Sequence, residues 1–406
     1  KGDAGNIDIK TTGDIRISGS NPQLDRKITP NSILPTSISS NTNGQGNAGR
    51  ITIDTQNRGK LSLFGGADIS SEIGPQAVGK GNGIKISAQA VDLIDGGTIS
   101  TSNVGGKGDA GNIDLKTIGD ISLSGSTPKS TAPTTQNSDR SAISSSTSGQ
   151  GNAGKITIDT QDRGKLSLDR SNIFTVINKE AVGSSNGIII SAREIALGNR
   201  SFISSSNLGG KGDAGNIIIN AKGDLELTDK SFISSTNAGQ GKTGDISLNI
   251  DRITLNSGII EAESFGGAGG NIQLTTSDLL LLRNSSDIST RSGSNGKNGN
   301  GGNITINSTL IIALPAGNND INANAVGGNG GRVDIISQGL FGIQFRPRLS
   351  DLTNDITSSS TFGQSGTVNI STPGTDPGKD STQLPNVPTD ASNQIAQTCG
   401  ASRENK

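Results

Sequence analysis

The side chains with the clearest catalytic potential in this sequence are carboxylates. Glu261 and Glu263 lie two residues apart in "IIEAES" (259–264), so both project from one face if this segment is a β-strand. Paired carboxylates can act as acid and base in polysaccharide cleavage. Exposed charges on a strand explain the pattern more simply, and we expect no catalytic residue here. Two further candidate pairs are Asp8 with Asp14 and Asp114 with Asp120.

A glycine-rich phrase raises the possibility of a ligand loop. "GGKGDAGNI" occupies 105–113 and 209–217, and "KGDAGNI" occupies 1–7. The phrase lacks the G-x-x-x-x-G-K-[ST] pattern of a phosphate loop, and no helical pattern follows it. In a calcium β-roll the aspartate would come one residue later than Asp109 and Asp213, within a nine-residue period that is missing here. We therefore expect a tight corner, with no cofactor and no metal.

The composition narrows the possible chemistry further. The 406 residues include no His, Trp or Tyr and a single Cys, Cys399, which disfavours a Ser-His pair or a zinc site. The formal net charge is −1 and aromatics are 2%, so neither a polyanion-binding field nor a base-stacking surface is expected. No nucleic-acid partner is predicted. The repeated basic residues, each diluted by nearby Asp, are Arg58, Lys60, Arg163 and Lys165.

Internal repeats set the architecture that must position these side chains. "AGRITIDTQNRGKLSL" (48–63) returns as "AGKITIDTQDRGKLSL" (153–168), which indicates duplication of a block of three periods. Successive periods are 26 to 44 residues long. The glycine that precedes the first apolar segment of each period falls at Gly5, Gly49, Gly83, Gly111, Gly154, Gly187, Gly215, Gly244, Gly270, Gly302, Gly331 and Gly366.

Each period shows three short alternating segments. In "GNIIINAKGDLELTDKSFISSTNAG" (215–239), apolar residues alternate with polar ones around Ile217, Leu225 and Ile233, with turn residues between. A hairpin meander would need tight Asn-Gly or Asp-Gly turns and would not repeat one phrase. We predict an all-β protein, a right-handed parallel β-helix of about twelve turns, each with three strands and three turns.

Stacked coils place equivalent residues above one another, about 4.8 Å apart. We expect Phe202 and Phe232, both in "SFISS", to stack on one wall. At one corner, asparagines would share amide hydrogen bonds: Asn6, Asn112, Asn216, Asn271 and Asn303. Inside the coil, isoleucines would stack: Ile7, Ile113, Ile217, Ile272 and Ile304.

One repeat domain, residues 1–372, accounts for most of the chain. Pro- and Ser-rich stretches at 21–37 and 127–141 are predicted excursions from the coil, because proline cannot donate to a central ladder. They could bind ligands or be tolerated loops. Residues 339–360 break the rhythm and are predicted to form an atypical capping region. Residues 373–406 are Pro-, Ser- and Asp-rich, which predicts a flexible, disordered tail.

Several segments resemble a known family. They are the "GNIDI…DIRISGS…SISSNTNGQGNAG" repeats, "QGLFGIQFR" (338–346), "DITSSSTFGQSGTVNISTPGTDP" (355–377) and "LPNVPTDASNQIAQTC" (384–399). Together they are similar to filamentous-haemagglutinin-like exoproteins of two-partner secretion, closest to the cyanobacterial branch. The first segment is typical of many solenoids, and the other three resemble the C-terminal end of this branch.

The resemblance implies a secreted, cell-surface adhesin that crosses the outer membrane through a dedicated transporter. The N-terminal domain that this transporter engages would lie upstream of Lys1, which begins in mid-repeat. A surface polysaccharide or glycoconjugate is the expected ligand, and no membrane insertion is expected because apolar runs are strand-sized. The alternatives are a β-helical polysaccharide-active enzyme and a passive surface-layer stalk.

Overall fold

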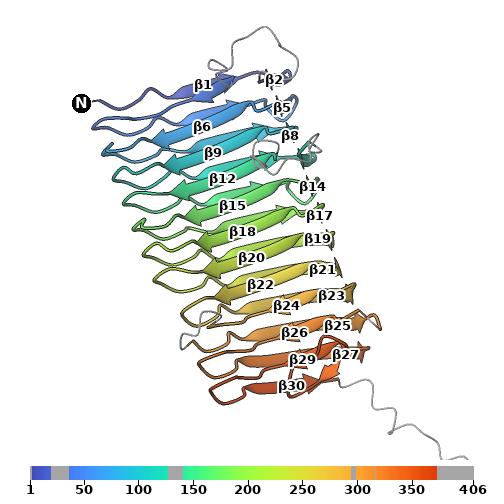
Figure 1. The fold of residues 1–406 in the computed structure, drawn as a ribbon. Coiled ribbons are helices and arrows are strands. Elements are labelled where there is room, and N and C mark those ends of the chain that lie inside the picture. Colours follow the sequence, from blue (N-terminus) through green and yellow to red (C-terminus); the bar gives the residue numbers. More distant parts are fainter. Residues whose placement is uncertain (1, 20–35, 127–139, 294–298, 316, 373–406) are drawn as a thin grey trace, which may run out of the picture.

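The computed structural model describes residues 2–19, 36–126, 140–293, 299–315 and 317–372. These residues form a parallel β-helix, as predicted, and they contain no α-helix (Figure 1). The predicted excursions lie outside the described residues except at their ends (36–37 and 140–141). The predicted tail, residues 373–406 with Cys399, lies outside them entirely.

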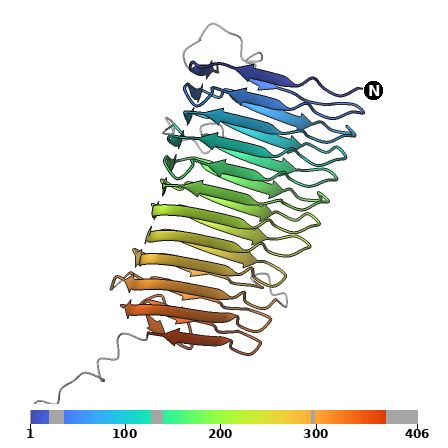
Figure 2. The same ribbon diagram turned by 180° about the vertical axis from the view of Figure 1, so that it is seen from behind.

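Three walls of strands run along the coil axis. The first wall has twelve strand positions, in line with the expected twelve turns, and Figure 2 shows the stack from behind. In the first six turns the first-wall strand and the second-wall strand are separate. The last first-wall strand, β30, is also a short separate strand. First-wall strands are β1 (Ile7–Lys10), β4 (Ile51–Asp54), β7 (Ile84–Ala88), β10 (Ile113–Thr117), β13 (Ile156–Asp159), β16 (Ile188–Ala192) and β30 (Thr367–Ser371). Second-wall strands are β2 (Ile15–Ser18), β5 (Lys60–Phe64), β8 (Ala90–Ile94), β11 (Ile121–Ser124), β14 (Lys165–Asp169) and β17 (Glu194–Gly198).

From Ile217 onwards the first and second walls are joined by long strands. The expected turn between Ile219 and Leu225 is therefore wrong: one strand runs through both, with a register irregularity between Ala221 and Asp224. The connection is short enough for ladder pairing to continue around the bend, as in a β-bulge. The long strands are β19 (Ile217–Thr228), β21 (Ile246–Asn256), β23 (Ile272–Arg283), β25 (Ile304–Ala313) and β27 (Arg332–Phe341).

The third wall is a separate sheet whose order follows the turns. Its last pairing is different, because β28 precedes β29 in the chain but lies beyond it at the sheet edge. The third-wall strands are β3 (Ser37–Ser39), β6 (Asp68–Ile73), β9 (Thr98–Asn103), β12 (Ala142–Thr147), β15 (Asn172–Ile177), β18 (Phe202–Asn207), β20 (Phe232–Asn237), β22 (Ile259–Ser264), β24 (Asp287–Ser289), β26 (Asp320–Asn322), β28 (Gln344–Phe345) and β29 (Asp355–Thr357).

A continuous aliphatic core fills the space between the walls. The predicted inner column is confirmed, since Ile113, Ile217, Ile272 and Ile304 are at most 1% exposed and lie in register with the isoleucines of adjacent turns. Ile7 occupies the same position but is only half-buried, because no described turn precedes it. Burial of such columns supplies most of the stability of the stack.

The predicted asparagine ladder is only partly present. Asn303 donates its side-chain amide to Asn271 Oδ1 at 3.0 Å, as expected. Asn6, Asn112 and Asn216 do not neighbour another asparagine at this corner, because other residue types occupy the turns between them. Their side-chain oxygens instead accept backbone N–H groups of the next turn, from Arg50, Lys155 and Asp245 respectively, at 2.8 to 2.9 Å.

A buried hydroxyl column explains the corner glycines. Ser145 and Ser205 point inward from the third wall and are fully buried. Their hydroxyls accept the backbone N–H groups of Gly154 and Gly215, at 2.7 and 2.9 Å. The glycines pack against the glycine of the preceding turn, where a β-carbon would overlap backbone atoms. The repeated phrase is therefore a corner with no room for a side chain.

Candidate functional site

The outer face of the third wall carries a ladder of hydroxyl groups. In β18 and β20 the side chains of Phe202, Ser206, Phe232 and Thr236 are half-buried, whereas those of Ser204 and Ser234 are buried. Ser234 donates to Ser204 Oγ and Thr236 donates to Ser206 Oγ, both at 3.0 Å. The hydroxyls therefore satisfy one another along the coil, and of these two pairs only Ser206 and Thr236 remain partly accessible to solvent. Such a surface can hydrogen-bond polar ligands that extend along the axis.

An aromatic stack borders this ladder and confirms the prediction for Phe202 and Phe232. Their ring centroids are 4.9 Å apart and their planes differ by 11°. Phe174, one turn earlier, is 6.1 Å from Phe202 and tilted by 46°. The in-register spacing of the coil sets the stacking distance. The rings therefore form an apolar strip beside the hydroxyls.

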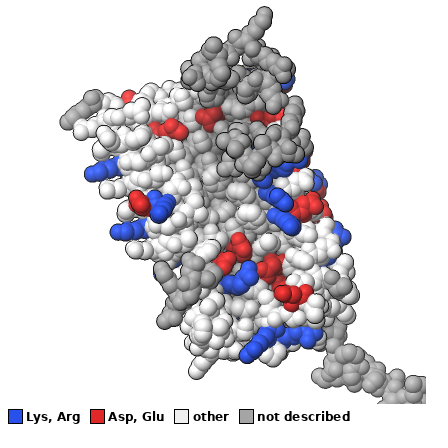
Figure 3. Space-filling view, in the orientation of Figure 1, with Lys and Arg blue, Asp and Glu red and all other residues white. Residues whose placement is uncertain are grey.

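Carboxylates gather on the same wall further along the chain. Glu261 and Glu263 are on one outward face of β22, as predicted. The next two turns add Asp287 and Asp320, which are paired in register. Arg291 lies close by, with its guanidinium 3.6 Å from the Asp287 carboxylate. Figure 3 shows acidic and basic side chains side by side on this face.

Burial shifts the acid–base behaviour of this group. Burial raises the pKa of Asp287 to about 7, and nearby carboxylates add to the rise while Arg291 opposes it. Burial also raises the pKa of Asp320 to about 6, assisted by the charges of Asp355 and Asp351 and opposed by the backbone N–H of Asp355. Burial, followed by repulsion from Glu263, raises the pKa of Glu261. Carboxyl groups in this range exchange protons near neutral pH.

The raised pKa values predict a pH-dependent stability. The folded state binds protons on Asp287 and Asp320 that the unfolded chain has already released, so stability falls as pH rises from about 4 towards about 7. We expect the melting temperature to drop by a few degrees between about pH 5 and about pH 8. Asp287→Asn should flatten this drop, measured by circular dichroism, whereas Asp8→Asn, at an exposed position, should not. A drop that is unchanged in Asp287→Asn would contradict the assignment.

Four of the other predicted aspartates accept backbone N–H groups in turns, and two lie on strands. Asp109 Oδ1 accepts the N–H of Asn152 at 2.8 Å, and Asp213 Oδ1 accepts that of Lys242 at 2.7 Å. Asp14 and Asp120 do the same for the N–H groups of Lys60 and Lys165, each at 2.8 Å. Asp8 and Asp114 are outward-facing and exposed on first-wall strands β1 and β10.

The predicted basic positions are distributed along the edge of the coil. Lys60 pairs with Asp92 of the next turn. Lys165 lies opposite Glu194 in the ladder between β14 and β17. Arg58 and Arg163 occupy turns that precede β5 and β14. The four residues therefore do not form one basic stripe.

Two surface depressions complete the candidate sites. One, of about 360 Å³, lies over small side chains of β11, β14 and β17, including Ser122, Ser167 and Ala196. The other, of about 480 Å³, lies at the corner where third-wall strands lead into the first wall. Arg50, Lys80 and Lys85 line this second space, which we call the corner depression.

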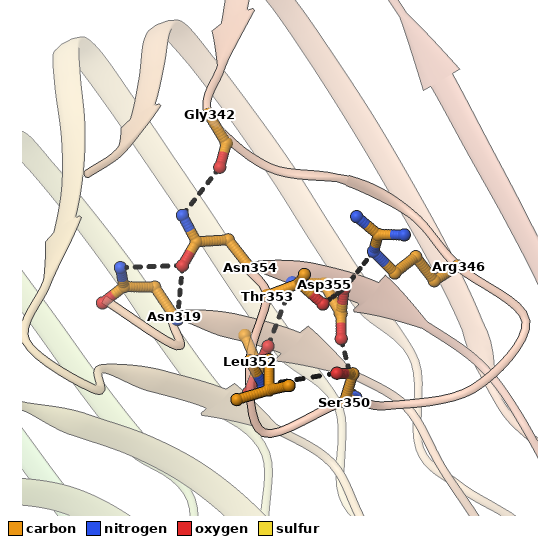
Figure 4. A network of polar contacts seen from close by, with 9 residues as sticks. Asn319, Gly342, Arg346, Ser350, Leu352, Thr353, Asn354 and Asp355 are labelled. Atoms are coloured by element: carbon orange, nitrogen blue, oxygen red, sulfur yellow. Dashed lines mark hydrogen bonds and ion pairs between the residues drawn. The ribbon is translucent and has the colours of Figure 1, made fainter. Parts of the chain in front are cut away.

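A polar network fixes the loop after β28. Asp355 accepts the N–H of Ser350 and the hydroxyl of Thr353, both at 2.8 Å, and pairs with Arg346 Nε at 2.7 Å (Figure 4). Asn354 donates to the carbonyl of Gly342 at 2.7 Å. This loop belongs to the segment predicted as a cap, residues 339–360.

Comparison of the chain with family models, with curated proteins and with solved structures finds no match. Within the described ranges, no three His, Cys, Asp or Glu side chains are grouped so as to hold a metal ion. The same ranges hold no helix with the length and apolar character needed to cross a membrane.

Proposed function

We propose that the chain is part of a secreted, cell-surface adhesin of the filamentous-haemagglutinin-like type. In this proposal a two-partner secretion transporter in the outer membrane exports the protein by engaging a domain upstream of Lys1. The coil then serves as a rod that presents a binding surface for a polysaccharide or glycoconjugate. This assignment extends the sequence resemblance given above.

The observation that supports this proposal best is the outer ladder of the third wall. Hydroxyl groups of successive turns hydrogen-bond along the axis, as between the half-buried Ser206 and Thr236, beside the stacked rings of Phe202 and Phe232. Polar groups next to an apolar strip suit sugars, which present both hydroxyls and C–H faces. The repetition along the coil suits a polymer more than a small molecule.

A rod of stacked coils also suits display away from a surface. Each turn adds about 4.8 Å, so twelve turns extend on the order of 55 Å. A coil of this kind can fold turn by turn as it emerges from a transporter, because each turn contacts only its neighbours.

The experiment that tests this function uses cells that produce the whole protein. Antibodies raised against the β-helix should label intact cells, and protease added outside the cells should remove this label. Deletion of the gene should reduce attachment to a polysaccharide-coated surface. A coil that is protected from protease until cells are broken would rule out the surface location.

A polysaccharide-active enzyme is the second candidate. Asp287, with a pKa raised to about 7, could donate a proton near neutral pH, and Glu261 and Glu263 lie on the adjacent strand. This candidate predicts new reducing ends when polysaccharide is incubated with the protein. An adhesin or a passive stalk predicts none.

A further inference from the structure

Two columns of side chains organise the corner between the third and first walls. In one column, the side-chain oxygen of Asn47 accepts the N–H of Lys80 in the next turn, and Asp109 accepts that of Asn152, both at 2.8 Å. In the other column, Asn6 accepts the N–H of Arg50. Where Asn or Asp occupies one of these positions, its side-chain oxygen thus accepts a backbone N–H group of the turn that follows.

The turn from Gly79 to Ile84 breaks both columns. It places Lys80, which has no acceptor, in the first column and Gly83, which has no side chain, in the second. Consequently the N–H groups of Asp109 and Asn112, one turn further on, have no hydrogen-bond acceptor among the described residues. Both residues line the corner depression, and two donors without acceptors suit an anion.

Positive charge surrounds these donors. Arg50, Lys80 and Lys85 line the depression, are exposed, and form no ion pair with any described residue. The lining also includes Asp109, one oxygen of which is bound to the N–H of Asn152, and the exposed Asp114. Three cations against two carboxylates leave a net positive site. Guanidinium and ammonium groups together with backbone N–H groups are the usual ligands of oxyanions.

Glycines leave the space that an anion would occupy. Gly81 and Gly111 contribute no side chain to the depression, whose volume is about 480 Å³. A β-carbon on Gly83 would overlap the backbone of Asn112, so the approach of these two turns depends on glycine. The volume is sufficient for a carboxylate or sulfate group together with part of a sugar.

The duplicated block provides an internal comparison. "AVGKGNGIKISA" (77–88) corresponds to "AVGSSNGIIISA" (181–192). Ser184 replaces Lys80, and its hydroxyl accepts the N–H of Asp213 at 3.1 Å, which restores the first column. Ile189 replaces Lys85, so two of the three cations are missing there. The cationic arrangement is therefore specific to the first block and is not required to form the corner.

We propose that the corner depression binds an oxyanion, and that this is the carboxylate or sulfate group of an acidic polysaccharide. The second part rests on the proposed adhesin function, whereas the oxyanion site stands on the unpaired donors and cations alone. The site would give the adhesin a preference for acidic over neutral polymers, because the hydroxyl ladder by itself does not distinguish them.

Calorimetric titration of the full chain tests this proposal at about 0.15 M salt, where weak surface attraction is screened. The probes are a uronate oligosaccharide, a sulfated oligosaccharide, a neutral oligosaccharide and inorganic sulfate. The double variant Lys80→Ser/Lys85→Ile replaces both lysines with the residues found at the same positions of the second block, so it should fold. We expect it to bind the acidic probes at least about tenfold more weakly than the wild type.

The control Lys211→Ser/Lys242→Ser removes two exposed lysines from the same corner of later turns. It should retain wild-type affinity. Equal loss in both double variants, or no loss in Lys80→Ser/Lys85→Ile, would overturn the oxyanion site. If inorganic sulfate binds but neither acidic oligosaccharide does, the oxyanion site stands and its assignment to a polysaccharide is wrong. If either of those two results appears while all variants still retain neutral polymers, the oxyanion site fails and the adhesin proposal stands.

Discussion

Gly154→Ala is expected to lower the free energy of unfolding by about 3 kcal/mol, because overpacking at backbone contacts is costly. A β-carbon at Gly154 would overlap the carbonyl oxygen of Gly111 in the preceding turn. The same residue donates its N–H to the buried hydroxyl of Ser145, so the backbone cannot retreat without losing that bond. Gly154 does not have a left-handed φ, so the effect comes from contact and not from torsional strain. Urea unfolding followed by circular dichroism measures it.

The first turn supplies a matched control for this substitution. Gly5 occupies the equivalent position of the same phrase, and a β-carbon there would meet no atom within 4 Å. Gly44, in the corner of the second turn, is equally open. Alanine at either position should leave the unfolding midpoint unchanged or slightly raised. Equal destabilisation by Gly154→Ala and Gly5→Ala would contradict the view that stacking makes these corners require glycine.

Asp355→Ala is expected to destabilise the C-terminal turns by about 3 kcal/mol or more, because the buried groups that Asp355 binds would be left without a partner. The Asp355 side chain is fully buried and faces Arg346 Nε at 2.7 Å. It also accepts the N–H of Ser350 and the hydroxyl of Thr353, so the substitution leaves two donors without their acceptor and Arg346 without its counter-ion. Hydrogen exchange should therefore accelerate across residues 342–360 before it changes in earlier turns.

Asp351→Ala is the matched control for this loop. Asp351 is exposed and lies four residues before Asp355, so the variant removes a carboxylate without opening the network. Exchange rates in residues 342–360 should stay at the wild-type level. If Asp355→Ala accelerates exchange in early turns, such as β4 to β9, as much as in the loop, the coil unfolds as one unit and this loop does not cap it.

Much of the fold follows from sequence periodicity. Alternation around Ile217 and Ile233 identified strands, and the Gly-Asn pair that precedes both Ile113 and Ile304 identified the column that those residues form. The stacking of Phe202 on Phe232 follows because one motif, "SFISS", occurs twice one period apart. In a coil, local repetition directly sets neighbours in space. This is why the sequence predicts contacts between residues far apart in the chain.

Other features depend on register between turns of unequal length. The amide ladder was expected because asparagine recurs at one corner position. In the structure, however, Arg50 occupies this position in the turn after Asn6, and Lys155 occupies it in the turn after Asn112. The register of Asp287 on Asp320, and hence their shifted pKa values, required the alignment of turns with different loops. The long strands from Ile217 onwards also could not be predicted, because a bend and a turn have similar local sequences.

Two signals in the sequence were sufficient but were missed. The inward hydroxyl of Ser145 precedes Gly154 by nine residues, and Ser40 precedes Gly49 by the same number. This spacing could have predicted the buried hydroxyl column. The exchange of Lys80 for Ser184 between duplicated blocks could likewise have drawn attention to the corner depression, because it changes the charge of an otherwise similar corner.

The most direct test of the proposed function incubates the purified full chain with a panel of bacterial and host polysaccharides. Retained protein and newly formed reducing ends are measured in the same samples. The adhesin proposal predicts retention on at least one polymer without new reducing ends. New reducing ends would contradict it in favour of an enzyme and direct attention to Glu261, Glu263 and Asp287. Absence of both signals would also contradict it, in favour of a passive stalk.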